Sequence, residues 1–347
     1  MNIKILAKKS LVALAESRIL DRFFAASRNR HVPIFMLHRF DDAGREVEGH
    51  SIDFLRSALT WIQENNYNVI SLDHLIDALD GVAELPERAV VFTVDDGFIE
   101  QVDLAAKVFE EFSFPVSIFL ISDFSSEKSW PWDYQVEYIL NRTLHEKIVF
   151  NVGEETITIA LTTHDNSRQE SITAVQDLLK GLTTDQAIKH AKNLAHLAEV
   201  KVEESIPASY FPVTWAKARA SESDNVRFGP HSTQHAILKR QSNEISLQEI
   251  EDSKKAVEKE LTLPLNIFCY PTGRKNIDFG QREMDTVKAL GMRAGLSVTP
   301  GYVDIHKHGS DEHRYCLPRF GFPSDMNDFI QLCSWVELLQ EKLRGNL

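Results

Sequence analysis

The chain has 347 residues, enough for one large α/β domain or two ordinary ones, and its 43% hydrophobic and 26% charged residues are an ordinary globular composition. The formal net charge of −13 leaves no basic field to attract phosphates, which excludes nucleic acid as the main partner. Three cysteines without a CxxC pair are not a disulfide framework, so a reducing compartment is favoured.

The N-terminal residues 1–30 have the apolar spacing of an amphipathic helix. Their apolar run at 11–15 is shorter than the ~7–15 residues of a signal peptide core, so we expect a cytoplasmic protein. The helix either packs on the domain or makes a peripheral membrane contact, which Lys4, Lys8 and Lys9 would suit. No run approaches the ~20 apolar residues of a membrane span.

Residues 31–347 alternate short apolar runs with helical periodicity, which predicts a parallel sheet with helices outside it. Seven or so strands favour an α/β barrel over an open dinucleotide-binding sheet, and no GxGxxG follows the first strand. In chain order the predicted elements are strand 32–37, helix 51–65, strand 69–72, helix 72–79, strand 89–94, helix 98–112, strand 116–121, strand 226–229, helix 246–261, strand 265–270, helix 281–290, strand 294–298, strand 317–320 and helix 326–343.

Residues 125–225 break this alternation. A helix at 134–140, a small hairpin at 150–159 and polar helical sequence at 167–199 occupy the stretch. We therefore predict a largely helical insertion within the barrel domain.

Chemically active side chains follow several predicted strands directly. His38, Asp95 with Asp96, His231 and Arg319 all stand just past an apolar run. Because the functional residues of α/β barrels lie at the C-terminal ends of the strands, we expect these side chains to converge at one mouth.

His231 and His235 are four residues apart, and on one helical turn both rings would lie on the same face and be able to share a metal. A catalytic zinc-type site keeps three protein ligands, and Asp95 or Asp96 can supply the third. The alternative for the pair alone is two surface histidines on a helix. The position of the pair after Gly229 and Pro230, at a strand end, favours the metal site.

The two acids at 95–96 also have two interpretations. Asp-Asp-Gly is an ordinary turn sequence after a strand. Adjacent carboxylates at the end of a pleated strand can instead point in different directions, so that one binds a cation and the other acts as a base.

These residues together resemble the polysaccharide deacetylases, the NodB-homology group of carbohydrate esterases. The first family motif, TFDDG, appears as TVDDG at 93–97, and the second appears as HSTQH at 231–235. The third, RxPYG, is matched in part by CYPTG at 269–273. The similarity covers about 32–125 and 225–322. It implies a distorted (β/α)₇ barrel that removes an N-acetyl group from a sugar with the help of a divalent metal.

Carried over by position, the resemblance makes Asp95 the general base and makes Asp96, His231 and His235 the metal ligands. Zn²⁺ is the expected ion, with Co²⁺ and Ni²⁺ as alternatives. The expected partner is an N-acetylated carbohydrate, as a glycan or on a lipid or nucleotide carrier in surface polysaccharide metabolism. No feature of the sequence predicts an oligomeric state.

The chain departs from the family pattern at two places. Cys269 replaces the arginine that orients the base, and Leu317-Pro318-Arg319 replaces the C-terminal motif that supplies the acid. The first strand resembles that of the permuted poly-N-acetylglucosamine deacetylase branch, in which an early strand-end histidine is the acid. That role falls to His38, and we predict that Arg319 orients Asp95 in place of the lost arginine. The altered motifs leave open a catalytically silent, metal-stabilised glycan-binding protein, and related barrels leave open a deformylase or another amide hydrolase.

Substrate contacts are expected around the same mouth. The segments after the strands at 89–94 and 265–270 are candidates for substrate binding and for a backbone N–H that holds the oxyanion. Three aromatic residues at the start of the insertion, Trp130, Trp132 and Tyr134, either stack on a sugar or anchor the insertion to the barrel. The predicted substrate-binding residues are Phe98, Tyr270, Pro271, Thr272, Gly273, Trp130 and Trp132.

Overall fold

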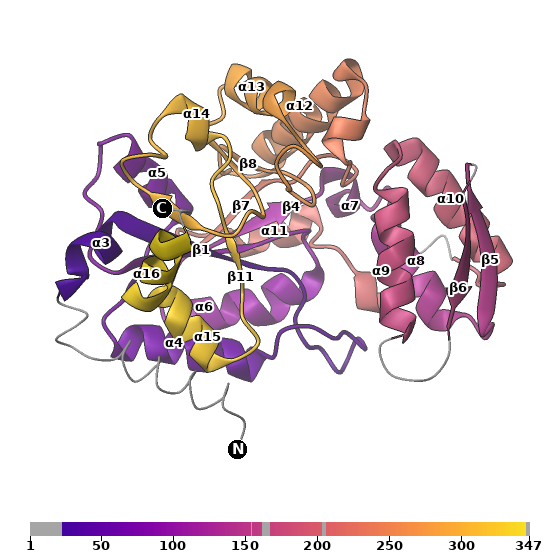
Figure 1. The fold of residues 1–347 in the computed structure, drawn as a ribbon, viewed down its shortest axis with the longest axis horizontal. Coiled ribbons are helices and arrows are strands. Elements are labelled where there is room, and N and C mark those ends of the chain that lie inside the picture. The colour runs from indigo at the N-terminus through magenta and orange to yellow at the C-terminus, as the bar shows by residue number, and fades with distance from the viewer. Residues whose placement is uncertain (1–22, 154, 162–166, 203–205, 345–347) are drawn as a thin grey trace.

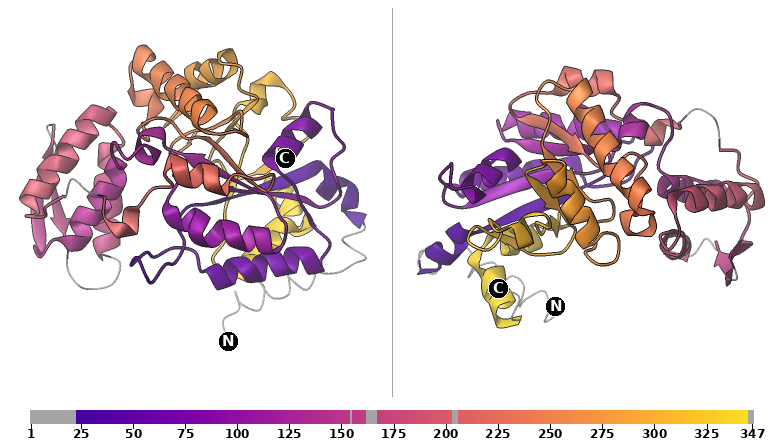
Figure 2. Two further views of the ribbon diagram at one scale, coloured as in Figure 1. Left: turned by 180° about the vertical axis from the view of Figure 1, so that it is seen from behind. Right: turned by 90° about the horizontal axis from the view of Figure 1, so that it is seen from above.

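The computed structural model describes residues 23–153, 155–161, 167–202 and 206–344. An α/β body with a parallel central sheet carries helices around it, and a smaller lobe projects from one side (Figures 1 and 2). Most of the predicted N-terminal helix lies outside the described residues, and its described end is α3 (Ala25–Arg30). Among the described residues, no helix is both long enough and apolar enough to cross a membrane.

The central sheet brings the C-terminal ends of its strands to one edge. Leu37 pairs with Val94, Val94 with Ile118 and Leu120 with Pro230, all in parallel register. The central strand is buried along its whole length, as expected for a parallel strand covered on both faces. The strands of this sheet are β1 (His31–Leu37), β2 (Asn68–Val69), β3 (Ala89–Val94), β4 (Val116–Leu120), β7 (Val226–Pro230), β10 (Tyr302–Asp304) and β11 (Phe320–Gly321).

Two further strands, β8 (Ile267–Cys269) and β9 (Ala294–Leu296), pair with each other in parallel. Leu265 N donates to Phe228 O at 2.8 Å beside β7, and Leu296 forms a bridge with Leu317. These contacts, further hydrogen bonds around Leu317 and a shared apolar core connect the β8–β9 pair to the rest of the fold. The closing strand predicted at 317–320 is shorter in the structure and consists of β11 alone. The strand β10 was not predicted, because three residues are too few to show a pattern, and it runs antiparallel to β1.

Most predicted helices of the body are present, with differences at their ends. Ser51 caps α4 by accepting from Phe54 N at 3.3 Å. Ser71 caps α5 by accepting from His74 N at 3.1 Å, so the strand predicted at 69–72 ends at Val69. The predicted final helix is broken at Ser334, whose backbone is extended. The helices are α4 (Ile52–Glu64), α5 (Leu72–Leu79), the π-helical η1 (Gln101–Ala106), α6 (Lys107–Glu111), α7 (Ser122–Ser125), the short turns η2 (Ala208–Tyr210) and η3 (Leu238–Arg240), α11 (Trp215–Ser221), α12 (Asn243–Glu260), α13 (Gln281–Ala289), α14 (Asp311–Arg314), α15 (Met326–Cys333) and α16 (Trp335–Arg344).

The lobe contains three helices and a hairpin between β4 and β7, and it has its own apolar core (Figure 1). A separate aromatic cluster, which includes Phe98, Phe124, Trp130 and Tyr210, packs residues of the body against residues of the lobe. This packing fixes the first helix of the lobe against the strand ends of the body. The elements of the lobe are α8 (Trp132–Arg142), β5 (Lys147–Val152), β6 (Glu155–Ala160), α9 (Ser167–Leu179) and α10 (Thr184–Leu197).

Candidate active site

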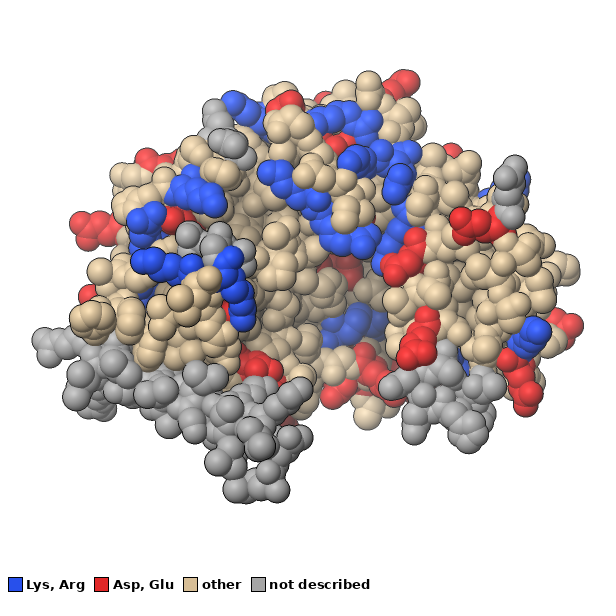
Figure 3. All heavy atoms as spheres, viewed as in Figure 1, with Lys and Arg blue, Asp and Glu red and all other residues tan. Residues whose placement is uncertain are grey.

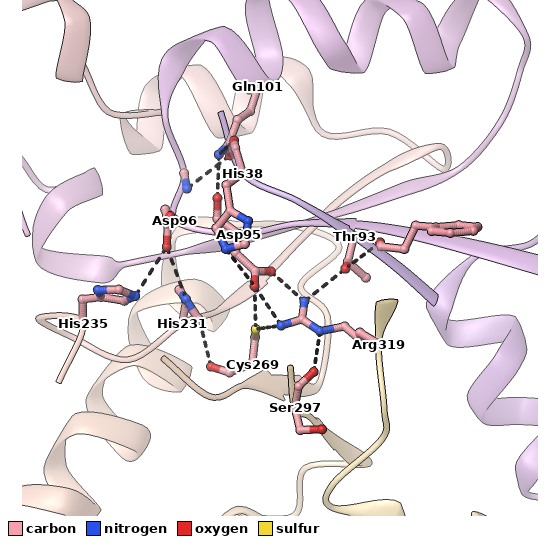
Figure 4. A network of polar contacts seen from close by, with 12 residues as sticks. His38, Thr93, Asp95, Asp96, Gln101, His231, His235, Cys269, Ser297 and Arg319 are labelled. Atoms are coloured by element: carbon pink, nitrogen blue, oxygen red, sulfur yellow. Dashed lines mark hydrogen bonds and ion pairs between the residues drawn. The ribbon is translucent and has the colours of Figure 1, made fainter. Parts of the chain in front are cut away.

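The strand ends bring together side chains that are far apart in the sequence (Figure 4). His38 follows β1, Asp95 and Asp96 follow β3, and His231 follows β7. Arg319 immediately precedes β11 and points into the same cluster. The predicted convergence is present for His38, Asp95 with Asp96, and His231, whereas Arg319 stands before its strand and not past one, which corrects its predicted position.

Asp95 and Arg319 form a buried bidentate ion pair. Nη1 of Arg319 donates to Oδ1 of Asp95 and Nη2 donates to Oδ2, both at 2.8 Å, and the arginine has no exposed surface. Burial alone would raise the pKa of Asp95, but the charge of Arg319 outweighs it and holds that pKa below its ordinary value. Asp95 is therefore ionised at neutral pH, and its carboxylate plane is fixed by the arginine.

Cys269 occupies the position of the expected family arginine and lies beside this pair. Its Sγ is 3.2 Å from Nη2 of Arg319 and 3.4 Å from Oδ2 of Asp95. Burial raises the pKa of the thiol, so Cys269 is neutral. Arg319 completes its contacts with Ser297 O at 2.9 Å and Thr93 Oγ1 at 3.1 Å. A small neutral side chain at 269 thus leaves room for the guanidinium that comes from residue 319.

Asp96 turns away from Asp95 because its backbone adopts a left-handed conformation, with φ of 83°. That conformation is costly for a residue with a Cβ and is typical of functional sites. Gly97 follows with the same φ, and a Cβ there would come within 2.7 Å of Leu120 Cδ2. The two adjacent carboxylates therefore point in different directions, and the turn requires glycine at 97.

The two histidines of the HSTQH segment do not lie on a helix, and this corrects the prediction. Residues 231–235 form a loop in which Ser232 and His235 have φ of 61° and 56°. The loop still places the two rings close together, with centroids 5.2 Å apart. Nε2 of His231 and Nε2 of His235 lie 3.4 and 3.5 Å from Oδ1 of Asp96.

The donor atoms of Asp96, His231 and His235 fit a divalent cation. They lie within 4.8 Å of one another and are buried. Oδ1 of Asp96 has no hydrogen-bond partner among the described residues, although it is buried between the two imidazoles. Nδ1 of His231 lies 2.8 Å from Cys269 O, which can only accept, so Nδ1 carries the proton and the Nε2 lone pair faces Asp96.

A second group, formed by Asp95, His231 and Cys269, also has its polar atoms within 4.8 Å. It fits a cation less well, because Arg319 already occupies both oxygens of Asp95 and because Cys269 keeps its proton. The first group is therefore the candidate metal centre. Its three members are the ligands expected from the sequence.

His38 stands beside this centre on the side open to solvent. Its Nε2 is 3.9 Å from Oδ2 of Asp95, and its side chain is 40% exposed. Gln101 in η1, which sequence reasoning missed, donates to His38 O at 2.6 Å and to Asp95 O at 2.5 Å. Gln101 therefore ties the ends of β1 and β3 together and fixes the separation of His38 from Asp95.

Four of the predicted substrate-binding side chains are buried away from any substrate. Phe98 and Tyr270 have no exposed surface, because the guanidinium of Arg39 covers the first and Phe279 stacks on the second at 3.8 Å. Trp130 packs in the aromatic cluster that joins the body and the lobe, which supports anchoring for this residue, and Trp132 packs in the core of the lobe.

The loop after β8 keeps its predicted role only as a hypothesis. Pro271, Thr272 and Gly273 follow Cys269, and Gly273 is held by Val298 N, which donates to Gly273 O at 2.9 Å. Thr272 and Gly273 both have left-handed backbone conformations. The loop therefore forms a turn that Val298 holds at Gly273.

A cavity of about 590 Å³ lies between the body and the lobe, where the space-filling view shows a hollow (Figure 3). Arg39, which follows His38, lines it together with Glu48, Glu137, Asn141 and Tyr210. Polar groups with a few aromatic rings suit a polyhydroxylated ligand better than an apolar one.

Comparisons with known proteins agree with this geometry. The family model described as Polysaccharide deacetylase matches residues 153–295, a range that includes His231, His235 and Cys269. Residues 153–295 therefore match a polysaccharide deacetylase domain. The matched range does not include His38, Asp95, Asp96 or Arg319, which the fold brings next to His231 and Cys269 from earlier and later parts of the chain.

The chain is also similar to curated proteins. It is 31% identical over 80 residues to the poly-β-1,6-N-acetyl-D-glucosamine N-deacetylases of Escherichia coli K12 and O157:H7. That match covers 22% of this chain and 12% of each relative, so the chain spans a small part of the length of these proteins.

Solved deacetylase structures share the fold. IcaB from Ammonifex degensii has a TM-score of 0.53 and 13% identity, and the Streptococcus pyogenes deacetylase PplD in complex with acetate has 0.51 and 16%. Each comparison covers 89% of this chain and 97% of the other. A de-N-acetylase from Aggregatibacter actinomycetemcomitans has a TM-score of 0.50 and 16% identity over 85% of this chain and 96% of its own.

Proposed function

We propose that this deacetylase domain is a metal-dependent hydrolase that removes the acetyl group from an N-acetylated sugar in surface polysaccharide metabolism. The observation that carries the proposal is the unpartnered, buried Oδ1 of Asp96 facing two imidazoles, next to the Asp95–Arg319 pair. The names of the similar proteins, deacetylases of poly-N-acetylglucosamine among them, support the same reaction.

In the proposed reaction Asp95 is the base and His38 is the acid. Asp95 accepts a proton from water as the water oxygen adds to the amide carbonyl carbon. His38 then donates a proton to the amide nitrogen as the C–N bond breaks, which yields acetate and a free amine. His38 Nε2 and Asp95 Oδ2 are 3.9 Å apart, so both can reach a single amide group.

Asp96, His231 and His235 would hold the metal. When bound, a divalent cation supplies polarisation of the amide carbonyl and lowers the pKa of water. A site with two imidazoles and one carboxylate suits Zn²⁺, and Co²⁺ and Ni²⁺ accept the same donors. Arg319 keeps Asp95 ionised and oriented, and is therefore a positioning residue for the base.

Removal of metal tests the proposal. Treatment with a chelator is expected to abolish release of acetate from N-acetylhexosamine oligosaccharides, and added Zn²⁺, Co²⁺ or Ni²⁺ is expected to restore it. Release of formate from a formylated sugar by the same protein would favour the deformylase. If the metal-loaded protein binds these saccharides but releases neither acid, the silent glycan-binding protein becomes the correct interpretation.

Replacement of His38 by alanine removes the proposed acid. We expect turnover to fall by ~10²-fold or more, because a protonated group no longer assists the leaving amine, while metal content stays that of the parent. Acetate release and metal content of the purified variant measure both. His74→Ala, which removes a histidine of α5 bonded to Glu84 O, is the control and should leave turnover unchanged. Full turnover in His38→Ala would remove His38 from the mechanism.

A further inference from the structure

The first turn of helix α8, which belongs to the lobe, reaches the candidate metal centre. The hydroxyl of Tyr134 donates to Oδ2 of Asp96 at 2.6 Å. Oδ2 of Asp133 lies 3.1 Å from Nδ1 of His235, which has no aligned hydrogen-bond partner among the described residues. Two consecutive residues of α8 thus contact two different candidate ligands.

Each candidate ligand offers one polar atom to the centre and has a second polar atom turned away from it. For His231 the second atom is Nδ1, which Cys269 O holds at the end of β8. For Asp96 and His235 the second atoms face Tyr134 and Asp133. Two of the three supports therefore come from the lobe, and only one comes from the sheet.

The side chains that give this support are themselves held in place. The ring of Tyr134 packs edge-on against Phe98 with centroids 4.6 Å apart and lies 6.0 Å from that of Tyr210. Oδ1 of Asp133 accepts from Tyr134 N at 3.2 Å, and Gln176 of α9 donates to Asp133 O at 2.9 Å. The positive end of the α8 dipole also favours a carboxylate in its first turn.

We propose that Asp133 and Tyr134 are positioning residues that set the metal affinity of the site. Tyr134 occupies Oδ2 of Asp96 and so leaves Oδ1 alone to face the cation. The carboxylate of Asp133, 3.1 Å from Nδ1 of His235, favours the proton on that nitrogen and so directs the Nε2 lone pair toward the same point. The lobe is then part of the metal centre, in addition to forming one wall of the cavity. This inference rests on the metal site of the proposed function.

Metal binding by the metal-free full chain tests the inference without any measurement of activity. Tyr134→Phe and Asp133→Asn are each expected to weaken Zn²⁺ and Co²⁺ binding by about 10–100-fold, the usual effect of losing a partner of a metal ligand. Competition with a chelator of known affinity measures the loss. Asp133→Glu, which keeps the carboxylate, is expected to recover part of it.

Tyr138→Phe is the matched control. Tyr138 lies one turn further along α8, and its ring is 6.1 Å from that of Tyr210, but it lines the cavity instead of contacting a ligand. Its loss should leave metal affinity at the parent value.

The outcomes separate this inference from the proposed function. A parent protein that binds neither ion would overturn the proposed function. If the parent binds and Tyr134→Phe and Asp133→Asn bind as tightly, the inference alone is wrong. The inference is also wrong if the metal-free variants fail to fold, or if Tyr138→Phe loses as much metal affinity as Tyr134→Phe. Either result would mean that these residues stabilise the lobe and do not position the ligands.

Discussion

Asp95→Asn is expected to reduce acetate release by ~10²-fold or more, because the amide cannot accept the proton of the attacking water. The change preserves the shape of the side chain, and Asp96, His231 and His235 are untouched, so the variant should still bind metal. Steady-state turnover on an N-acetylated oligosaccharide, together with metal content, measures the two effects separately.

The interpretation of Asp95→Asn requires a control for the charge that it removes. Asp103→Asn also removes a carboxylate, one that pairs with Arg45 and Lys217 away from the candidate site, and turnover should remain close to that of the parent. Asp95→Asn also leaves the buried guanidinium of Arg319 without its counter-charge, so the variant must be assayed below its own unfolding temperature. Turnover equal to that of the parent would exclude Asp95 as the base.

Arg319→Met is expected to lower the free energy of unfolding by about 3–5 kcal/mol at neutral pH, because it leaves a buried carboxylate without its partner. The guanidinium contacts Asp95 twice and also Ser297 O and Thr93 Oγ1, so the methionine replaces none of these hydrogen bonds. Turnover should fall as well, since Asp95 would no longer be held ionised and oriented. Denaturant unfolding monitored by circular dichroism measures the stability.

The effect of Arg319→Met should depend on pH. In the parent, burial raises the pKa of Asp95 but Arg319 outweighs it, so the native pKa is lowered. The pair therefore stabilises the fold above the ordinary carboxyl pKa of about 3.9 and loses this contribution as pH falls through the lowered native value. In the variant the buried carboxyl has a raised pKa. The deficit in stability should thus be largest near neutral pH and shrink toward pH of about 4.

A surface arginine supplies the control for that measurement. Arg56 donates to both oxygens of Glu111 at 3.0 and 3.1 Å, but both side chains are exposed. Arg56→Met removes the same type of bidentate pair from a position where water replaces it, so stability should change little at any pH. If Arg319→Met behaves like Arg56→Met, the buried pair does not stabilise the fold.

Local sequence predicted the elements that carry the site. The apolar run at 89–94 predicted a buried strand, because a strand covered on both faces needs apolar residues throughout. The two acids and the glycine that follow predicted a turn, because glycine readily adopts the positive φ that the turn has at 97. A second local pattern, the spacing of His231 and His235, gave a wrong prediction. A spacing of four residues matches a helix, but the backbone there takes left-handed values at Ser232 and His235 that residue types do not reveal.

The sequence by itself determined which residue types stand at the strand ends, and with them the candidate base, acid and ligands. The tertiary structure decided what each of them contacts. The resemblance predicted that Arg319 orients Asp95, but the bidentate contact across 224 positions of sequence comes from the fold, and so does the contact of Tyr134 with Asp96 from a separate lobe. Such contacts depend on how strands and helices pack in space, and a buried hydrogen bond between distant residues has no periodicity along the chain from which to predict it. For that reason the aromatic residues that open the lobe suggested sugar binding in sequence, whereas in the folded chain Trp130 packs where body and lobe meet and Trp132 packs in the core of the lobe.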